Sequence, residues 1–213
     1  MVALALAVAG CSSGCTSGSS RYDSRTGVSA SERVVWGDRP VPKGGGTYKI
    51  GAPYKVSGRW YFPGEDRSYD RIGIASWYGS DFHGRRTANG EVFDMTALAA
   101  AHPTLPLPSY AYVTNVENGR TLLVRINDRG PYANDRIIDL SRRAAELLGF
   151  AGQGLARVRV RYAGPAPLSG DDRYEQAFLV HQAWYTGQAA SRLAQRSASD
   201  LRPVAMDVPF RRE

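Results

Sequence analysis

From Thr47 onward, the chain is divided into short segments of β-type residues that are separated by turn residues. Examples are RIGIASWYG (residues 71–79), RTLLVRI (120–126) and LARVRVRY (155–162). Short runs of β-branched, aromatic and alternating apolar residues, bounded by Gly, Pro, Asn and Asp, are typical of strands. Many short strands with few helices predict a mainly β fold, and we expect a small barrel.

Three segments give clear local predictions. Residues 110–126 predict a hairpin, because two strand-like runs flank Asn118-Gly119, a pair that favours tight β-turns. Residues 141–149 predict a helix that Ser141 caps and Gly149 ends. In residues 155–162 apolar and basic residues alternate, which predicts a strand with one buried face and with its arginines (Arg157, Arg159 and Arg161) outward.

The chain begins with an apolar run, residues 1–10, which is too short to cross a bilayer as a helix but fits the apolar region of a secretory signal. Small residues lead directly to Cys11, and this pattern resembles a bacterial lipobox, in which the cysteine is acylated. A chance Ala/Val-rich start with an unrelated cysteine is the alternative. Because residues 1–10 contain no Lys or Arg, we expect translation to start upstream. Without a lipid, Cys11 is able to form a disulfide with Cys15.

Composition divides the chain into four parts. Residues 1–10 are expected to be a lipoprotein signal peptide, and the Ser/Gly-rich residues 11–46 a flexible, disordered tether. Residues 47–164 carry the strand pattern of the barrel. Residues 165–213 are expected to be a linker and a short tail, in which residues 174–198 are able to form one amphipathic helix.

The chain is basic, with a net charge of +7 at pH 7. A lipid anchor at Cys11 predicts a location in the cell envelope facing the periplasm, and Ser12, in place of Asp, favours the outer membrane. A basic exported domain is attracted to anionic polymers, which there means the cell wall or the membrane surface, and we expect no nucleic acid as partner. A basic solvated surface without any partner is the alternative.

One stretch, VRINDRGPYANDRIIDLS (residues 124–141), places Asp128 at the end of a predicted strand. Turn chemistry alone explains such a sequence, because Asn and Asp bond their own backbone while Gly and Pro shape the turn. A carboxyl held at a strand end is also a common place for a catalytic acid. These residues alone leave both interpretations open.

Two longer stretches carry a resemblance to a known family. GIASWYGSDFHGRRTANGEVFD (73–94) and AAAHPTLPLPSYAYVTNVENGRTLLVRINDRGPYANDRIIDLS (99–141) resemble the rare lipoprotein A family of bacterial septal lipoproteins, which includes lytic transglycosylases. The resemblance implies a six-stranded double-psi β-barrel with one or two short helices. It also implies cleavage of the β-1,4 bond from N-acetylmuramic acid to N-acetylglucosamine in peptide-stripped glycan, with 1,6-anhydro ends as products.

The resemblance assigns acid/base chemistry to three residues. It implies that Asp128 is the general acid/base, while Glu91 and His102 position it or the sugar, or tune its pKa. Without the family, Glu91 reads as a loop charge after a turn pair, and His102 as a buried structural histidine. Asp139 is expected to brace the barrel or the start of the helix at Ser141.

Candidate substrate contacts are rings that stack on sugars, an amide and a guanidinium: Trp77, Tyr78, Asn89, Arg129 and Tyr132. For Trp77 and Tyr78, packing in the core is an equal alternative. The three histidines are scattered without ligand spacing, and no phosphate-binding glycine loop is present, so we expect neither a metal nor another cofactor.

A different class of function also fits the sequence: a non-catalytic peptidoglycan-binding lipoprotein that has kept the barrel. Residues 165–213 are too short for the complete septal glycan-binding domain that many family members carry, which leaves septal targeting open. Cell-division proteins are further candidate partners.

Overall fold

The computed structural model describes residues 22–23, 28–37, 39–132 and 135–187. The predicted lipobox with Cys11, residues 12–21, 24–27 and 38 of the predicted tether, and the tail after residue 187 lie outside the described residues. Within the described part of the predicted tether, Val35 is buried and Arg33 forms a backbone bridge with Arg85. The strands and helices are β1 (Tyr22–Asp23), β2 (Val28–Ser29), β3 (Tyr54–Val56), β4 (Arg59–Tyr61), β5 (Asp70–Tyr78), β6 (Ala99–Ala101), β7 (Ser109–Asn115), β8 (Thr121–Asp128), β9 (Arg136–Ser141), α1 (Arg142–Leu148), β10 (Ala156–Pro165) and α2 (Arg173–Val180).

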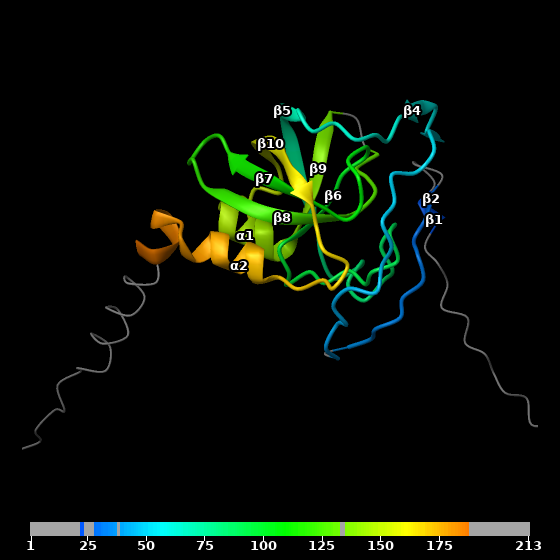
Figure 1. The fold of residues 1–213 in the computed structure, drawn as a ribbon, viewed down its shortest axis with the longest axis horizontal. Coiled ribbons are helices and arrows are strands. Elements are labelled where there is room, and N and C mark those ends of the chain that lie inside the picture. The colour runs from blue at the N-terminus through cyan, green and yellow to red at the C-terminus, as the bar shows by residue number, and fades with distance from the viewer. Residues whose placement is uncertain (1–21, 24–27, 38, 133–134, 188–213) are drawn as a thin grey trace, which may run out of the picture.

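Strands β5 to β10 close into one barrel in the order β10-β5-β9-β6-β8-β7, and β7 pairs back with β10 (Figure 1). The pairs β5/β9 and β6/β8 are parallel, and the other four ladders are antiparallel. Closure leaves no free sheet edge in this part of the molecule. The expectation of a mainly β, six-stranded barrel is confirmed.

Alternate residues of each strand fill the barrel, as the period of a β-strand requires. On β10 the apolar residues Ala156, Val158 and Val160 are buried, and the basic residues between them are exposed. This confirms the predicted outward face. The interior is apolar, and its fully buried strand residues include Ala75, Ala100, Val113, Leu122, Val124, Ile126, Ile138 and Leu140.

The predicted hairpin and helix are both present. β7 and β8 pair antiparallel, and Gly119 in the turn between them has a φ of 70°. In α1 the hydroxyl of Ser141 accepts a hydrogen bond from the amide of Ala144 at 3.2 Å, and Gly149 ends the helix in the left-handed conformation, with φ 83°.

Two features differ from the sequence predictions. β6 was not expected, because it consists of three alanines with no local strand signal; it is a strand because it pairs with both β8 and β9. The predicted helix over residues 174–198 ends at Val180, and residues 183–187 form a separate helical stretch. Leu179 and Trp184 both pack against the core, and on a straight helix they would point about 140° apart.

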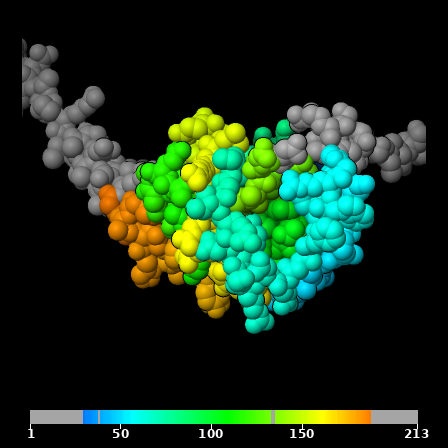
Figure 2. Space-filling view, turned by 90° about the horizontal axis from the view of Figure 1, so that it is seen from above, coloured from blue at the N-terminus to red at the C-terminus, as the bar shows by residue number. Residues whose placement is uncertain are grey.

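The segments outside the barrel lie on different sides of it. Helix α2 covers the outer face of β7 and β8, where the ring of Phe178 packs against Tyr112 with centroids 5.2 Å apart. The β3–β4 hairpin lies at the opposite end of the molecule from α2 (Figures 1 and 2). Among the described helices, none has the length and apolar character that crossing a membrane requires.

Candidate functional site

Asp128 is the last residue of β8, and an irregularity in the strand register decides which way it faces. In the ladder with β6, Ala100 pairs with Ile126 and Ala101 pairs with Asp128, so Asn127 is an extra residue. Such a bulge changes the alternation of side chains along a strand. Asp128 therefore leaves the interior series that contains Ile126 and faces outward beside Ala101.

The two carboxylate oxygens of Asp128 have different surroundings. Oδ1 accepts hydrogen bonds from the backbone amides of Ala88 and Arg129, both at 2.8 Å. Oδ2 accepts no hydrogen bond from the described residues. Burial raises the pKa of Asp128 to about 6, although the two amides and the charges of Arg129 and Lys49 act to lower it. A carboxyl with such a pKa both donates and accepts a proton near neutral pH.

Glu91 is buried, with 4% of its surface exposed, and its charge is fully paired. Arg125 holds both carboxylate oxygens, with its Nε 3.0 Å from Oε2 and its Nη2 2.6 Å from Oε1. The side-chain amides of Asn127 and Asn89 each donate a further hydrogen bond at 3.0 Å. Burial favours the protonated form, but these hydrogen bonds outweigh it and lower the pKa of Glu91. Glu91 is therefore an ionised anchor.

The loop of residues 87–91 connects this anchor to Asp128. Asn89 and Glu91 bond each other through their side chains, and Ala88, which directly precedes Asn89, donates its amide to Asp128. The hydroxyl of Thr87 donates to Oδ1 of Asn89 at 2.8 Å, which fixes the beginning of the same loop. The Glu91–Arg125 pair thereby holds the loop that binds one oxygen of Asp128.

His102 meets Asp128 through its backbone, since its amide donates to the Asp128 carbonyl at 3.0 Å. Its Nδ1 accepts from the amides of Thr104 and Leu105 at 3.1 and 3.0 Å, so the ring proton lies on Nε2, which donates to the hydroxyl of Tyr69 at 2.9 Å. Burial, with a contribution from Arg129, lowers the pKa of His102 to about 3. His102 is neutral and holds the loop after β6.

The guanidinium of Arg129 binds the backbone. It donates to the carbonyls of His102 (3.2 Å), Leu105 (2.6 Å) and Ile50 (2.7 Å). Three segments that are distant in the sequence are joined in this way next to Asp128. The side chain of Asn89 is likewise engaged within the protein, because it bonds the side chains of Thr87 and Glu91 in its own loop.

Two of the predicted aromatic residues lie near Asp128. Tyr132 packs edge-on against Tyr54 and Tyr61, and the charge of Asp128 contributes, after burial, to raising the pKa of Tyr132. Tyr78 stacks on Phe93 at 4.1 Å. Burial, followed by the charges of Asp128 and Asp139, raises the pKa of Tyr78, and its buried hydroxyl has no hydrogen-bond partner within the described residues.

The structure does not bring Trp77 to this site. Its ring packs against the core, and its Nε1 donates to the carbonyl of Ala151 at 3.1 Å. Tyr78, the next residue of β5, points to the other face of the strand. Of the predicted residues, the structure brings together Asp128, Glu91, Asn89, Arg129, Tyr78, Tyr132 and the backbone of His102.

A second carboxyl lies on the same outer face. Ala101 pairs with Asp128 on one side and with Asp139 on the other, and Asp139 pairs with Ser76. Two strand spacings place the Asp128 and Asp139 backbones roughly 10 Å apart. Asp139 accepts from the hydroxyl of Ser76 at 2.6 Å and pairs with Arg136 at 3.2 Å, and burial raises its pKa.

The residues that sequence reasoning missed are the partners of the site: Arg125, Asn127 and Tyr69. Arg125 had a usable signal, because it is a charged residue inside the apolar run of β8. Within the part of the chain that the structure describes, no group of three or more His, Cys, Asp or Glu side chains is placed to hold a metal ion.

The fold and the site define a closed six-stranded β-barrel with a carboxyl of raised pKa on its outer face. Residues 70–160 match the family described as Lytic transglycolase (DPBB_1). The chain is 52% identical over 160 residues to the endolytic peptidoglycan transglycosylase RlpA of Pseudomonas aeruginosa, covering 74% of this chain and 45% of that protein. It is 43% identical over 149 residues to the protein of the same name from Neisseria meningitidis, covering 70% and 62%.

The barrel of this chain therefore belongs to the rare lipoprotein A family. The chain spans less than two thirds of the length of either relative. Among solved structures, an apo expansin of Clavibacter michiganensis matches 46% of this chain and 53% of its own, at 16% identity with a TM-score of 0.37.

Proposed function

We propose that the protein is an endolytic lytic transglycosylase of peptidoglycan. Its substrate is peptide-stripped glycan, in which it cleaves the β-1,4 bond from N-acetylmuramic acid to N-acetylglucosamine and leaves a 1,6-anhydro end. The observation that carries this proposal is the carboxyl of Asp128, which has a pKa of about 6 and one oxygen without a hydrogen bond from the described residues. The similarity to two endolytic peptidoglycan transglycosylases supports it.

The proposed reaction uses Asp128 twice. The protonated carboxyl first donates its proton to the glycosidic oxygen, so that the bond from this oxygen to C1 breaks and the leaving sugar departs as an alcohol. The carboxylate then takes the proton of the C6 hydroxyl, whose oxygen bonds to C1 and closes the anhydro ring. Asp128 ends protonated as it began, and no water is consumed.

The other predicted residues support Asp128 in this proposal. Glu91 is a positioning residue, because its ion pair with Arg125 leaves it no proton to give. His102 is also a positioning residue, since both ring nitrogens are engaged within the barrel. Arg129 fixes the walls of the site, and Tyr78 and Tyr132 provide aromatic rings next to Asp128.

A cell-wall substrate implies a location in the envelope. We propose that a lipid on Cys11 anchors the protein there, facing the periplasm, and that the outer membrane is its destination. Mass spectrometry of the N-terminal peptide, purified from membranes, tests the anchor: an acylated Cys11 is expected, and an unmodified Cys11 would contradict it.

The function is tested with the Asp128→Asn variant. The amide oxygen of Asn keeps an acceptor for both backbone amides, so the variant is expected to fold. Mass spectrometry of stripped glycan incubated with wild type should show anhydro-ended fragments, and the variant should release none. Intact glycan from both proteins, with binding retained, would favour the non-catalytic wall-binding lipoprotein.

A further inference from the structure

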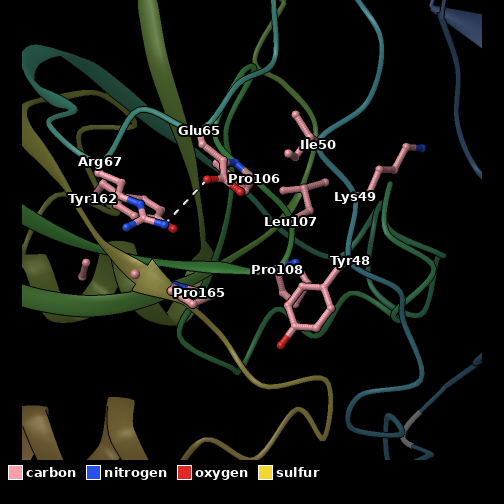
Figure 3. Close-up of a pocket in the computed structure, with 12 residues that line it drawn as sticks. Tyr48, Lys49, Ile50, Glu65, Arg67, Pro106, Leu107, Pro108, Tyr162 and Pro165 are labelled. Atoms are coloured by element: carbon pink, nitrogen blue, oxygen red, sulfur yellow. Dashed lines mark ion pairs between the residues drawn. The ribbon is translucent and has the colours of Figure 1, made fainter.

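Figure 3 shows a pocket of about 790 Å³, one of whose lining residues, Ile50, accepts a hydrogen bond from Arg129 beside Asp128. Aromatic rings, prolines and one isoleucine form much of its wall: Tyr48, Ile50, Pro106, Pro108, Tyr162 and Pro165. Its ends carry charge, with Lys49 at one end and the pair Glu65–Arg67 at the other (Figure 3). This size is within the range of ligand sites, about 300–1,000 Å³.

The wall of the pocket is continuous with the Asp128 site. Lys49 and Leu107, which both line the pocket, exchange backbone hydrogen bonds of 2.6 and 2.9 Å. The adjacent Ile50 accepts from Arg129, whose backbone amide binds Asp128. The ammonium of Lys49 also donates, at 3.1 Å, to the carbonyl of Ala88. Residues 48–50 therefore lie between the Asp128 site and the pocket, where a polymer bound at Asp128 is able to contact them.

The aromatic ring of Tyr48 is exposed and is held in place at its hydroxyl, as a ring that stacks on a ligand requires. It is 60% exposed, yet its hydroxyl donates to the carbonyl of Ala166 at 3.1 Å. The next residue, Lys49, forms a backbone bridge with Leu107, which holds the main chain beside Tyr48. An aromatic side chain held in this way loses little conformational freedom when a ligand arrives.

We propose that this pocket is a distal subsite for the same glycan strand, in which the ring of Tyr48 stacks on one sugar. The inference rests on the proposed function for the identity of the polymer. The apolar face of a pyranose ring fits the aromatic ring and the prolines. Lys49 and Arg67 offer cations to the lactyl carboxylate of N-acetylmuramic acid, and Glu65 offers an acceptor to hydroxyl or amide groups.

The test measures binding of stripped glycan to the Asp128→Asn protein, in which the strand stays intact. Adding Tyr48→Ala should weaken the affinity about five- to tenfold, because one ring stack is lost. Tyr48→Phe keeps the ring and should recover most of the affinity. Tyr174→Ala is the matched control, since Tyr174 is 61% exposed on α2. This control should bind as the parent does.

A second measurement does not depend on substitutions at Tyr48. Stripped glycan titrated into labelled Asp128→Asn protein should shift the amide resonances of Ala163 and Gly164, which line the pocket. Unchanged resonances, or equal affinity after Tyr48→Ala, would overturn the subsite. A proline-rich peptide that shifts these amide resonances when glycan does not would also overturn the subsite, because a pocket lined by aromatic rings and prolines also suits extended peptides.

The two proposals fail in different ways. If wild type releases no anhydro ends but Tyr48→Ala weakens glycan binding, the proposed reaction is wrong and the subsite stands. If wild type cleaves glycan and Tyr48→Ala alters neither KM nor affinity, the reaction stands and the subsite is wrong.

Discussion

At the scale of single residues, the proposed reaction depends on the protonation of Asp128. The raised pKa, about 6, means that the carboxyl is protonated in mildly acidic solution and ionised above it. Since the first step requires the proton, kcat/KM should fall as the pH rises through about 6. A pH profile measured with stripped glycan checks this, and activity that increases across the same interval would mean that the ionised form acts first.

The same shift predicts a change in folding stability with pH. The pKa of Asp128 is raised in the folded state above its ordinary 3.8, so the bound proton stabilises the fold fully below pH 3.8. This contribution is lost as the pH rises through about 6. Asp128→Asn removes the effect, so urea unfolding at neutral pH should show the variant to be more stable by on the order of 1–3 kcal/mol relative to wild type. A gap that is as large at pH 4 would contradict this.

The buried ion pair of Glu91 with Arg125 predicts a second effect of a single residue on folding stability. Glu91→Gln removes one charge of a buried pair and leaves Arg125 buried without its counter-ion, which should cost about 3–5 kcal/mol of unfolding free energy. Glu146→Gln is the control, because its pair with Arg142 is an exposed contact across one helical turn. Chemical denaturation of both variants measures the difference, and equal losses would show that the buried pair does not hold the loop.

The residues of the site were predictable only in part. Asp128 and Glu91 were found through the family resemblance, since turn chemistry alone also explained Asp128 and made Glu91 a loop charge. Their partners come from other strands, so neither the ion pair with Arg125 nor the proton position on His102 follows from local sequence. Trp77 shows the same limit, because an aromatic residue of a strand fits the core and a binding face equally well.

At the scale of elements, local sequence signals predict some strands and helices, whereas others form only through pairing with distant segments. The β7–β8 hairpin and α1 were predictable because a turn pair or a cap lies within each segment. β6 and the bulge at Asn127 were not, because both are defined by pairing between segments more than twenty residues apart. This bulge directs Asp128 outward, so the decisive detail of the site is a property of two strands.

Helix α2 is an integral part of the barrel domain. Glu175, which is 2% exposed, accepts a hydrogen bond from Tyr110 at 3.2 Å, and Leu179 packs into the core. Leu179→Ala should lower the unfolding free energy by about 2–5 kcal/mol, whereas Val180→Ala, at a position 49% exposed, should cost little. Urea unfolding followed by far-UV and near-UV signals tests this. A similar, small loss in both variants would mean that α2 is only loosely attached.

At the scale of the whole molecule, the barrel presents two carboxyls on one outer face, those of Asp128 and Asp139. Asp139 lies two strands from Asp128, and a second carboxyl at this position raises the question whether water attacks the glycosidic bond. Inverting hydrolases place two carboxyls about 6.5–9.5 Å apart so that one activates water. The two reactions therefore differ in the source of the oxygen at the new end of the glycan.

Cleavage of stripped glycan in water labelled with heavy oxygen, followed by mass spectrometry of the new ends, distinguishes the proposed reaction from hydrolysis. The proposed reaction gives anhydro ends without the label, because the C6 hydroxyl of the sugar supplies the oxygen. Reducing ends that carry the label would contradict it, and would make Asp128 the acid of a hydrolase in which Asp139 activates water.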